Sequence, residues 1–168
     1  MLTVEKIGGT SMSQFKDVME NIIVGKRTSS DLYNRIFVVS AYNNVTNWLL
    51  EHKKTGEPGV YVQFLENGDY SIGLDSLCQR LLQINRGFEE IGLNQNEARE
   101  FITYRIDQAK TMLHSLSKVM ASGYVNAEDI CLAARELLAS IGEAHSAAYF
   151  VNLWNNNGVN DRFIDLGG

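Results

Sequence analysis

The feature that most constrains the fold is a glycine pair, Gly8-Gly9, which separates a strand pattern from a helix pattern. Leu2, Val4 and Ile7 suggest a short β-strand, and apolar residues at helical spacing follow the glycines over residues 15–23. This order of strand, glycine turn and helix is how many α/β domains begin. A glycine pair in this place also lets the backbone approach an anion closely.

A second strand pattern follows the first helix pattern, which ends at Gly25. The run Ile36-Phe37-Val38-Val39 is apolar and rich in β-branched and aromatic residues, as expected of a parallel strand covered on both faces. We predict an α/β fold with a mainly parallel sheet, whose strands lie near 2–7, 35–40 and 162–167. Three parallel strands alone leave open edges, which suggests that more sheet normally follows.

A large helical insertion is predicted between the second and third strands. Apolar residues at helical spacing predict three helices. The first begins at Val45, the second runs from Leu74 to a stop at Gly92, and the third has a narrow apolar seam from Ile102 to Met120. This seam could pack inside the domain or against a second subunit. Asn126 is predicted to cap a further helix.

Two parts of this insertion are less clear. Residues 58–70 fit a short helix begun by Pro58, which we prefer, or a hairpin at Asn67-Gly68. Beyond Gly142 another helix continues, and it ends at the polar run 155–158.

Composition and charge exclude several classes of protein. The chain has 168 residues, 45% of them hydrophobic, and a net charge of -5, which fits one globular domain and lacks the basic excess of nucleic-acid or anionic-membrane binders. The sequence has neither a signal-peptide layout nor an apolar run long enough for a membrane span, so we expect a cytoplasmic protein. Cys78 and Cys131 have no partner at metal spacing and are expected to be reduced thiols.

The glycine turn could bind phosphate. Lys6, at the end of the first strand, would add a positive charge beside Gly8 and Gly9, where a transferring phosphoryl group gains most from fixed charge. The alternative is a plain strand-to-helix turn with a solvated lysine. Taken alone, the turn does not separate the two interpretations.

Two further polar clusters are candidate sites. Residues 40–47, Ser-Ala-Tyr-Asn-Asn-Val-Thr-Asn, directly follow the second strand, where open parallel sheets bind their ligands. In Gly142-Glu143-Ala144-His145-Ser146 a carboxylate at the start of a helix could hold a substrate ammonium. The alternatives are helix capping by Asn44 or Thr46, and a helix-dipole role for Glu143.

The three histidines are not predicted to form a site. His52, His114 and His145 lie on different segments and offer no pair of metal ligands, so surface or helix-packing roles are expected and no metal site is predicted.

Four short motifs, in this order and spacing, resemble those of the aspartokinase branch of the amino-acid-kinase family. They are Lys6 to Ser11, Val38 to Ala41, Asn44 to Asn47 and Gly142 to Ala147. The stretches 5–12 and 50–59 are similar to aspartokinases found with ectoine synthesis.

The resemblance implies a three-layer αβα sandwich and ATP-dependent phosphorylation of the side-chain carboxylate of L-aspartate to 4-phospho-L-aspartate. A magnesium ion would arrive with ATP, and a homodimer is expected. By the same resemblance Lys6, the catalytic residue, would contact the phosphates with Gly8 and Gly9, and Ser40, Thr46 and Glu143 would hold aspartate. Glu143 would bind the amino group.

Two positions depart from the family pattern. Asn44 stands where the family has glycine, which asparagine can replace in a left-handed turn, and Ala144 replaces a frequent arginine. The nucleotide-side portion and the regulatory ACT domains of the family have no counterpart here. Residues 1–168 are therefore expected to form the N-terminal, substrate-side portion of the catalytic domain, inactive alone.

Two alternatives stay open. Another amino-acid or carbamate kinase would share the glycine turn. A non-catalytic binding module could instead dimerise through the seam from Ile102 to Met120.

Overall fold

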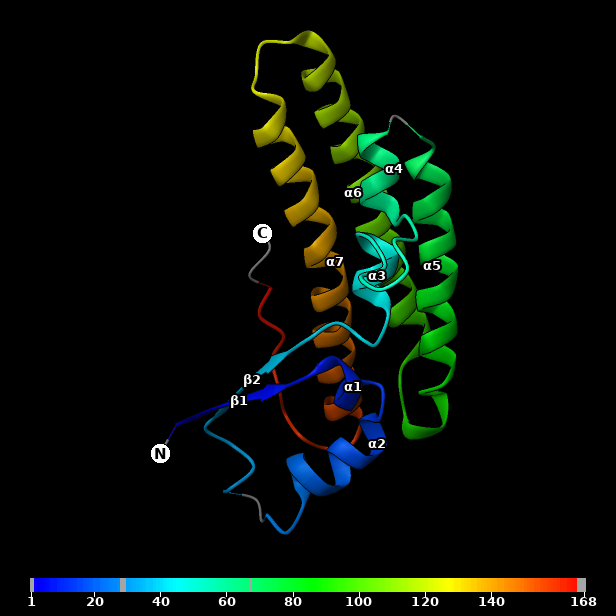
Figure 1. The fold of residues 1–168 in the computed structure, drawn as a ribbon. Helices are drawn as coiled ribbons and strands as arrows, with labels where there is room; N and C mark the ends of the chain where they lie inside the picture. The colour runs from blue at the N-terminus through cyan, green and yellow to red at the C-terminus, as the bar shows by residue number, and fades with distance from the viewer. Residues whose placement is uncertain (1, 28–29, 67, 166–168) are drawn as a thin grey trace.

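The computed structural model describes residues 2–27, 30–66 and 68–165. Within them the chain is mostly helical and carries a two-stranded parallel sheet, so the α/β prediction holds in this coarse form. Figure 1 shows the long helices side by side, with the sheet and the first helices packed at one end of them. The three-layer sandwich of the amino-acid-kinase type stays a prediction.

The sheet consists of β1 (Thr3–Ile7) and β2 (Arg35–Val39), which confirms the first two predicted strands and their parallel direction. In its register Ile7 lies opposite Val39, so the carboxyl ends of both strands meet at one edge. Glu5 and Arg35 form an ion pair of 2.7 Å across the sheet. The hydrogen bond from Arg35 lowers the pKa of the Glu5 carboxyl.

The third predicted strand is wrong where the structure describes it. Residues 162–165 have no strand partner; they run back beside the long helices, while 166 and 167 lie outside the described residues. The Phe163 ring packs edge-on against Phe101 with centroids 5.9 Å apart, and Asp165 pairs with Arg105 at 2.8 Å. The apolar residues of this segment therefore pack on helix side chains rather than on a sheet.

The sheet is covered on one face only, not on both as predicted. On the covered face the Phe37 ring lies 4.8 Å from that of Trp154. Val4, Ile36 and Val38 alternate with the covered side chains and are exposed. The apolar run of β2 thus has one packed and one open side.

The connection between the strands is helical, as predicted. It contains α1 (Gly9–Met12), α2 (Phe15–Val18) and a π-helical turn, η1 (Met19–Val24). Met12, Phe15, Val18 and Ile23 are buried in the core, and Gly25 ends the connection with φ of +52°. Only glycine adopts this conformation readily, which is why the helix stops there.

Two short helices open the insertion, α3 (Val45–Leu49) and α4 (Val60–Leu65). The helix preferred for residues 58–70 is therefore confirmed, although it begins after Gly59, because Pro58 forms an isolated bridge with Glu51. Asn67, part of the alternative hairpin, lies outside the described residues.

The next helix, α5 (Tyr70–Arg86), is shorter than predicted. Gly92 does not close it but caps a separate 3-10 turn, η2 (Glu89–Ile91), with φ of +98°. The sequence pattern joined the two because the apolar spacing continues through Phe88.

The long helix α6 (Gln95–Ser122) carries the predicted seam. Ile102, Ile106 and Leu113 are fully buried, and α6 packs against α5 on one side and the last helix on the other. The seam therefore packs inside the domain, and the alternative of a dimer built on these residues is wrong.

The last helix, α7 (Ala127–Asn156), is continuous. Its predicted cap is confirmed, since the Asn126 side chain accepts a hydrogen bond from the Glu128 N–H at 3.1 Å. The prediction that a helix starts at Gly142-Glu143 is wrong, because both residues lie in the middle of α7.

In the described part of the chain, no helix combines the length and the apolar character needed to cross a membrane. Cys78 and Cys131 are free thiols, both half-buried.

Candidate active site

The candidate site lies at the edge where β1 and β2 both end. The Ser40 N–H donates to the Ile7 carbonyl at 3.0 Å, which continues the ladder by one step beyond β2. The glycine turn after β1 and the polar loop after β2 therefore leave the sheet side by side.

Gly9 holds these two loops together. A Cβ atom at this position would lie 2.6 Å from the Ala41 carbonyl oxygen, so only glycine allows the backbones to come this close. A side chain at Gly8 would meet nothing within 4 Å. Packing thus explains Gly9, whereas the fold does not explain Gly8, whose backbone is open to a ligand.

Ser13 adds a hydrogen-bonded link between the loops. Its hydroxyl accepts from the Asn43 N–H at 3.1 Å and donates to the Gly9 carbonyl at 3.2 Å. Ser13 was not predicted from the sequence, because no local pattern marks a serine of this kind for a tertiary contact.

Asn44 takes the left-handed conformation that was expected for the residue in the place of glycine. Its φ is +67°, and its side chain makes no capping hydrogen bond to α3. Thr46 follows within α3 with an exposed side chain, so neither residue caps the helix through its side chain.

Gly142 brings α7 against the loop after β2 and against α3. A Cβ atom there would lie 2.9 Å from Ala41 Cβ and 3.0 Å from Val45 Cγ1, so a side chain would push α7 away. The buried Ser146 hydroxyl donates to the Ser40 carbonyl at 2.8 Å. These two contacts fix Ser40 relative to α7.

Glu143, next to Gly142, has an exposed side chain. Because it lies in the interior of a long helix, the helix-dipole role considered for it does not apply. Within the described residues its carboxylate has no ion pair or hydrogen bond, and Thr46 is likewise free of side-chain partners. Both groups are available to a ligand.

Lys6 is exposed and also without an ion pair among the described residues. It pairs with Val38 in the register and therefore extends from the uncovered face of the sheet. The helix α7, which carries Glu143, packs on the covered face through Trp154. A ligand that contacts both Lys6 and Glu143 must pass around the carboxyl edge of the sheet.

Two cavities of the described structure lie apart from the predicted site residues. One of about 440 Å³ includes Asn47 but not Thr46, and one of about 740 Å³ lies beside Phe15 and Lys16. At the sheet edge, Lys6, Thr46 and Glu143 are exposed.

A buried polar network supports α7 behind this surface. His145 is fully buried and its Nε2 lies 3.2 Å from Asn85 Oδ1, and the Asn85 amide donates to the Tyr149 hydroxyl at 2.7 Å. Tyr149 in turn donates to the Ala98 carbonyl at 2.8 Å. Burial lowers the pKa of His145 to about 3, so the ring is neutral. The predicted helix-packing role of this histidine is confirmed.

Comparison with known proteins gives one informative match. The whole chain is 48% identical, over 171 aligned residues, to the aspartate kinase Ask_Ect of Stutzerimonas stutzeri (strain A1501). The chain is similar to an ectoine-type aspartokinase. It spans only 36% of the length of that relative. The resemblance stated from the motifs is therefore confirmed over the whole chain.

No protein-family model matches the chain, and no solved structure matches it. The sequence relationship to the aspartokinase is thus the comparison that bears on function.

Proposed function

We propose that this chain forms the aspartate-binding side of an ATP-dependent aspartate kinase, which phosphorylates the side-chain carboxylate of L-aspartate to 4-phospho-L-aspartate. The observation that carries the proposal is the convergence of the loops after β1 and β2 with α7, through Gly9 and Gly142. The 48% identity to an aspartokinase supports the same function.

Three residues would bind aspartate. The free carboxylate of Glu143 suits the ammonium group, because an opposite charge at an open site is the simplest partner for a cation. The Thr46 hydroxyl, at the start of α3, suits a carboxylate oxygen. Ser40 is held by Ser146 on α7, so its position relative to Glu143 is fixed.

ATP would bind through Lys6, Gly8 and Gly9. Lys6 makes no ion pair among the described residues and Gly8 has open space, so a phosphate group could be bound by the Gly8 backbone and the Lys6 ammonium. Gly9 contributes differently, since its α-carbon faces the Ala41 carbonyl and its role is to hold the turn in place. Mg²⁺-ATP, when bound, supplies the phosphoryl group and neutralises part of its charge.

In this phosphoryl transfer the protein would mainly position the two substrates and stabilise negative charge. The substrate carboxylate is itself the nucleophile, so no protein nucleophile is needed. Glu143 would orient the aspartate backbone, and Lys6 would stabilise negative charge on the transferring group.

A binding experiment tests the substrate. We expect L-aspartate to shift amide signals of residues 40–47 in ¹H–¹⁵N NMR spectra of the chain, and L-glutamate or carbamate to shift them less. Glu143→Gln should weaken aspartate binding about tenfold or more, because it removes the charge opposite the ammonium. Glu136→Gln, an exposed glutamate two turns earlier on α7, is the matched control and should bind normally.

Equal binding by Glu143→Gln and the unmodified chain would contradict the assignment of Glu143. Tighter binding of L-glutamate or carbamate than of L-aspartate would indicate another kinase of the same fold, with that compound as its substrate. A coupled ADP-release assay tests the expectation that this chain alone is inactive, and turnover with L-aspartate would contradict it.

The expected homodimer stays a prediction. Light scattering of the chain should give twice the monomer mass, and a monomer mass would show that residues 1–168 do not dimerise alone.

A further inference from the structure

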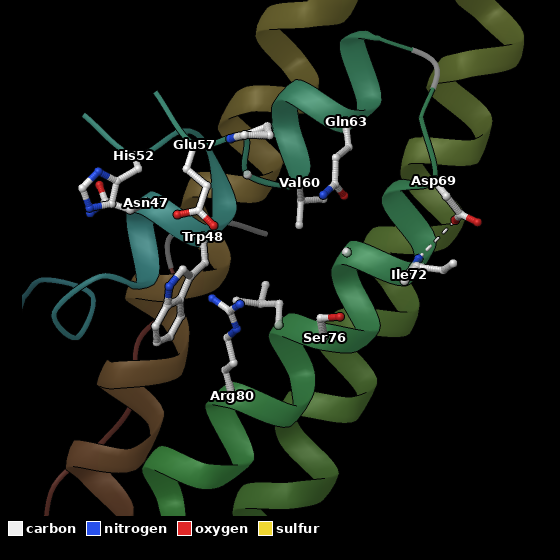
Figure 2. Close-up of a pocket in the computed structure, with 14 residues that line it drawn as sticks. Asn47, Trp48, His52, Glu57, Val60, Gln63, Asp69, Ile72, Ser76 and Arg80 are labelled. Atoms are coloured by element: carbon white, nitrogen blue, oxygen red, sulfur yellow. Dashed lines mark hydrogen bonds between the residues drawn. The ribbon is translucent and has the colours of Figure 1, made fainter. Parts of the chain in front are cut away.

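A second site lies in the cavity of about 440 Å³ between α3, α4 and α5 (Figure 2). Its volume falls within the range of about 300–1,000 Å³ that is usual for small-molecule sites. None of the six residues proposed for aspartate and ATP lines it. This cavity is therefore distinct from the proposed aspartate and ATP site, although Asn47, next to Thr46, lines it.

One charged group of the cavity is a free cation. The Arg80 guanidinium lies over the Trp48 ring, 4.9 Å from its centroid. Among the described residues no carboxylate lies within 4.0 Å of Arg80, and it makes no hydrogen bond there. Trp48 holds one face of the guanidinium, and its N–H groups are left for an acceptor, for which a carboxylate has the matching fork geometry.

The other free charge is the Glu57 carboxylate. Figure 2 shows Glu57 and Arg80 directed toward one another across the cavity, beside Trp48. They do not form an ion pair, so the space between them separates two unpaired opposite charges. An occupant with a negative and a positive end would pair both.

Two other polar groups of the cavity make hydrogen bonds. The Asp69 carboxylate accepts from the Ile72 N–H at 3.2 Å, and His52 Nδ1 accepts from the Thr55 N–H at 3.1 Å. Gln63 Oε1 is buried without a hydrogen-bond partner among the described residues. A buried acceptor of this kind is costly unless a donor reaches it.

The Gln63 side chain packs against Gly73 of α5. A side chain at position 73 would overlap Gln63 Oε1, so the glycine in α5 makes room for the amide at the wall of the cavity. The remaining lining is mixed: it includes the polar Asn47 and Ser76 and the apolar Val60, Ile72 and Leu77, of which Val60 and Leu77 are buried.

We propose that this cavity binds a free α-amino acid with an apolar side chain. Its carboxylate pairs with Arg80, its ammonium pairs with Glu57, and its side chain packs against Val60 and Leu77. The occupant is a zwitterion because Arg80 and Glu57 carry opposite charges and do not pair with one another.

The test is an NMR titration of the ¹⁵N-labelled chain with L-leucine, N-acetyl-L-leucine and L-leucinamide. We expect L-leucine to shift the indole N–H signal of Trp48 and to leave that of Trp154, which is buried outside the cavity, in place. The acetylated compound lacks the ammonium and the amide lacks the carboxylate, so both should bind about tenfold more weakly or worse.

Variants check the two charges. Arg80→Gln and Glu57→Gln should each weaken L-leucine binding about threefold to tenfold, since each removes one ion pair of an exposed side chain. Arg86→Gln, an exposed arginine near the end of the same helix, is the control and should bind normally. Circular dichroism confirms that each variant is folded, because all three replace exposed side chains.

The proposal is overturned if L-leucine at about 10 mM leaves the Trp48 signal unchanged, because the dissociation constant would then be well above about 10 mM. It is also overturned if L-leucinamide binds as well as L-leucine, or if Arg86→Gln weakens binding as much as Arg80→Gln. L-aspartate binding is read from the amide signals of residues 40–46, none of which lines this cavity, so failure here leaves the proposed kinase function intact.

Discussion

The helical part of the molecule and the two-stranded sheet differ in how completely they bury their apolar residues. In α6 the seam from Ile102 to Leu113 is enclosed between neighbouring helices. In the sheet, by contrast, Val4 and Val38 remain exposed on the open face. Apolar side chains are thus enclosed in the helical region, whereas those of the sheet are covered on one face only.

This difference separates stability from chemistry. The helices bury most of the core and should set the free energy of unfolding. A ligand has access to three exposed side chains that make no ion pair among the described residues: Lys6 in β1, Thr46 in α3 and Glu143 in α7. Substitutions in the two regions should therefore affect different measurements.

The largest expected effect is on the helical core. Leu113→Ala should lower the free energy of unfolding by about 2–5 kcal/mol, because Leu113 is fully buried and the substitution leaves a cavity. Val38→Ala on the open face of the sheet should cost no more than about 0.5 kcal/mol. Urea denaturation measures both, and similar losses would contradict the comparison.

At the sheet edge, Gly9→Ala should lower the free energy of unfolding by about 1–3 kcal/mol, because the new Cβ meets the Ala41 carbonyl at 2.6 Å. Gly8→Ala is the matched control, since its Cβ meets nothing, and should change stability by less than about 0.5 kcal/mol. Thermal unfolding compares the two. If both glycines tolerate alanine equally, the close approach of the loops is wrong.

The free energy of unfolding should also fall in mild acid because of His145. Its folded pKa of about 3 lies below its unfolded value of 6.5, so protonation favours the unfolded state. The stabilisation is complete above the unfolded pKa and declines as the pH falls from 6.5 toward 3. The loss between pH 7 and pH 5 should be about 2 kcal/mol.

Urea denaturation at several pH values measures this slope. His145→Gln should flatten it, whereas His114→Gln, which changes an exposed histidine on α6, should leave it unchanged. An equal slope in His145→Gln and the unmodified chain would contradict the role of the buried ring.

The smallest effect is expected at Ser146. Ser146→Ala removes the hydrogen bond to the Ser40 carbonyl and should lower the free energy of unfolding by about 1 kcal/mol. It should also weaken L-aspartate binding, because Ser40 loses its link to α7. Ser140→Ala, whose hydroxyl bonds only to Leu137 within the same helix, should leave aspartate binding unchanged. Calorimetric titration distinguishes the two variants.

Much of the fold follows from local sequence patterns. The first two strands, the helix stop at Gly25 and the cap at Asn126 were predictable, because alternation, glycine conformation and capping depend on near neighbours in the chain. The left-handed turn at Asn44 was predictable for the same reason. The motifs also identified the resemblance to aspartokinases.

The wrong predictions concern residues whose conformation and contacts depend on distant parts of the chain. The apolar pattern at 162–165 is typical of a strand. In the structure, however, Phe163 packs against Phe101 of α6, and Asp165 forms an ion pair with Arg105 of the same helix. Gly142 was read as the start of a helix, whereas it is a contact surface inside α7. Neither partner is visible from local spacing.

Local sequence patterns were enough to predict the short-range elements and to select the candidate residues, because backbone conformation is largely set within a few residues. Tertiary contacts, by contrast, set which face of the sheet is covered, make Gly9 a packing residue while Gly8 stays open, and bring Arg80 and Glu57 to one cavity. These contacts join residues far apart in the chain, and close packing in three dimensions selects them.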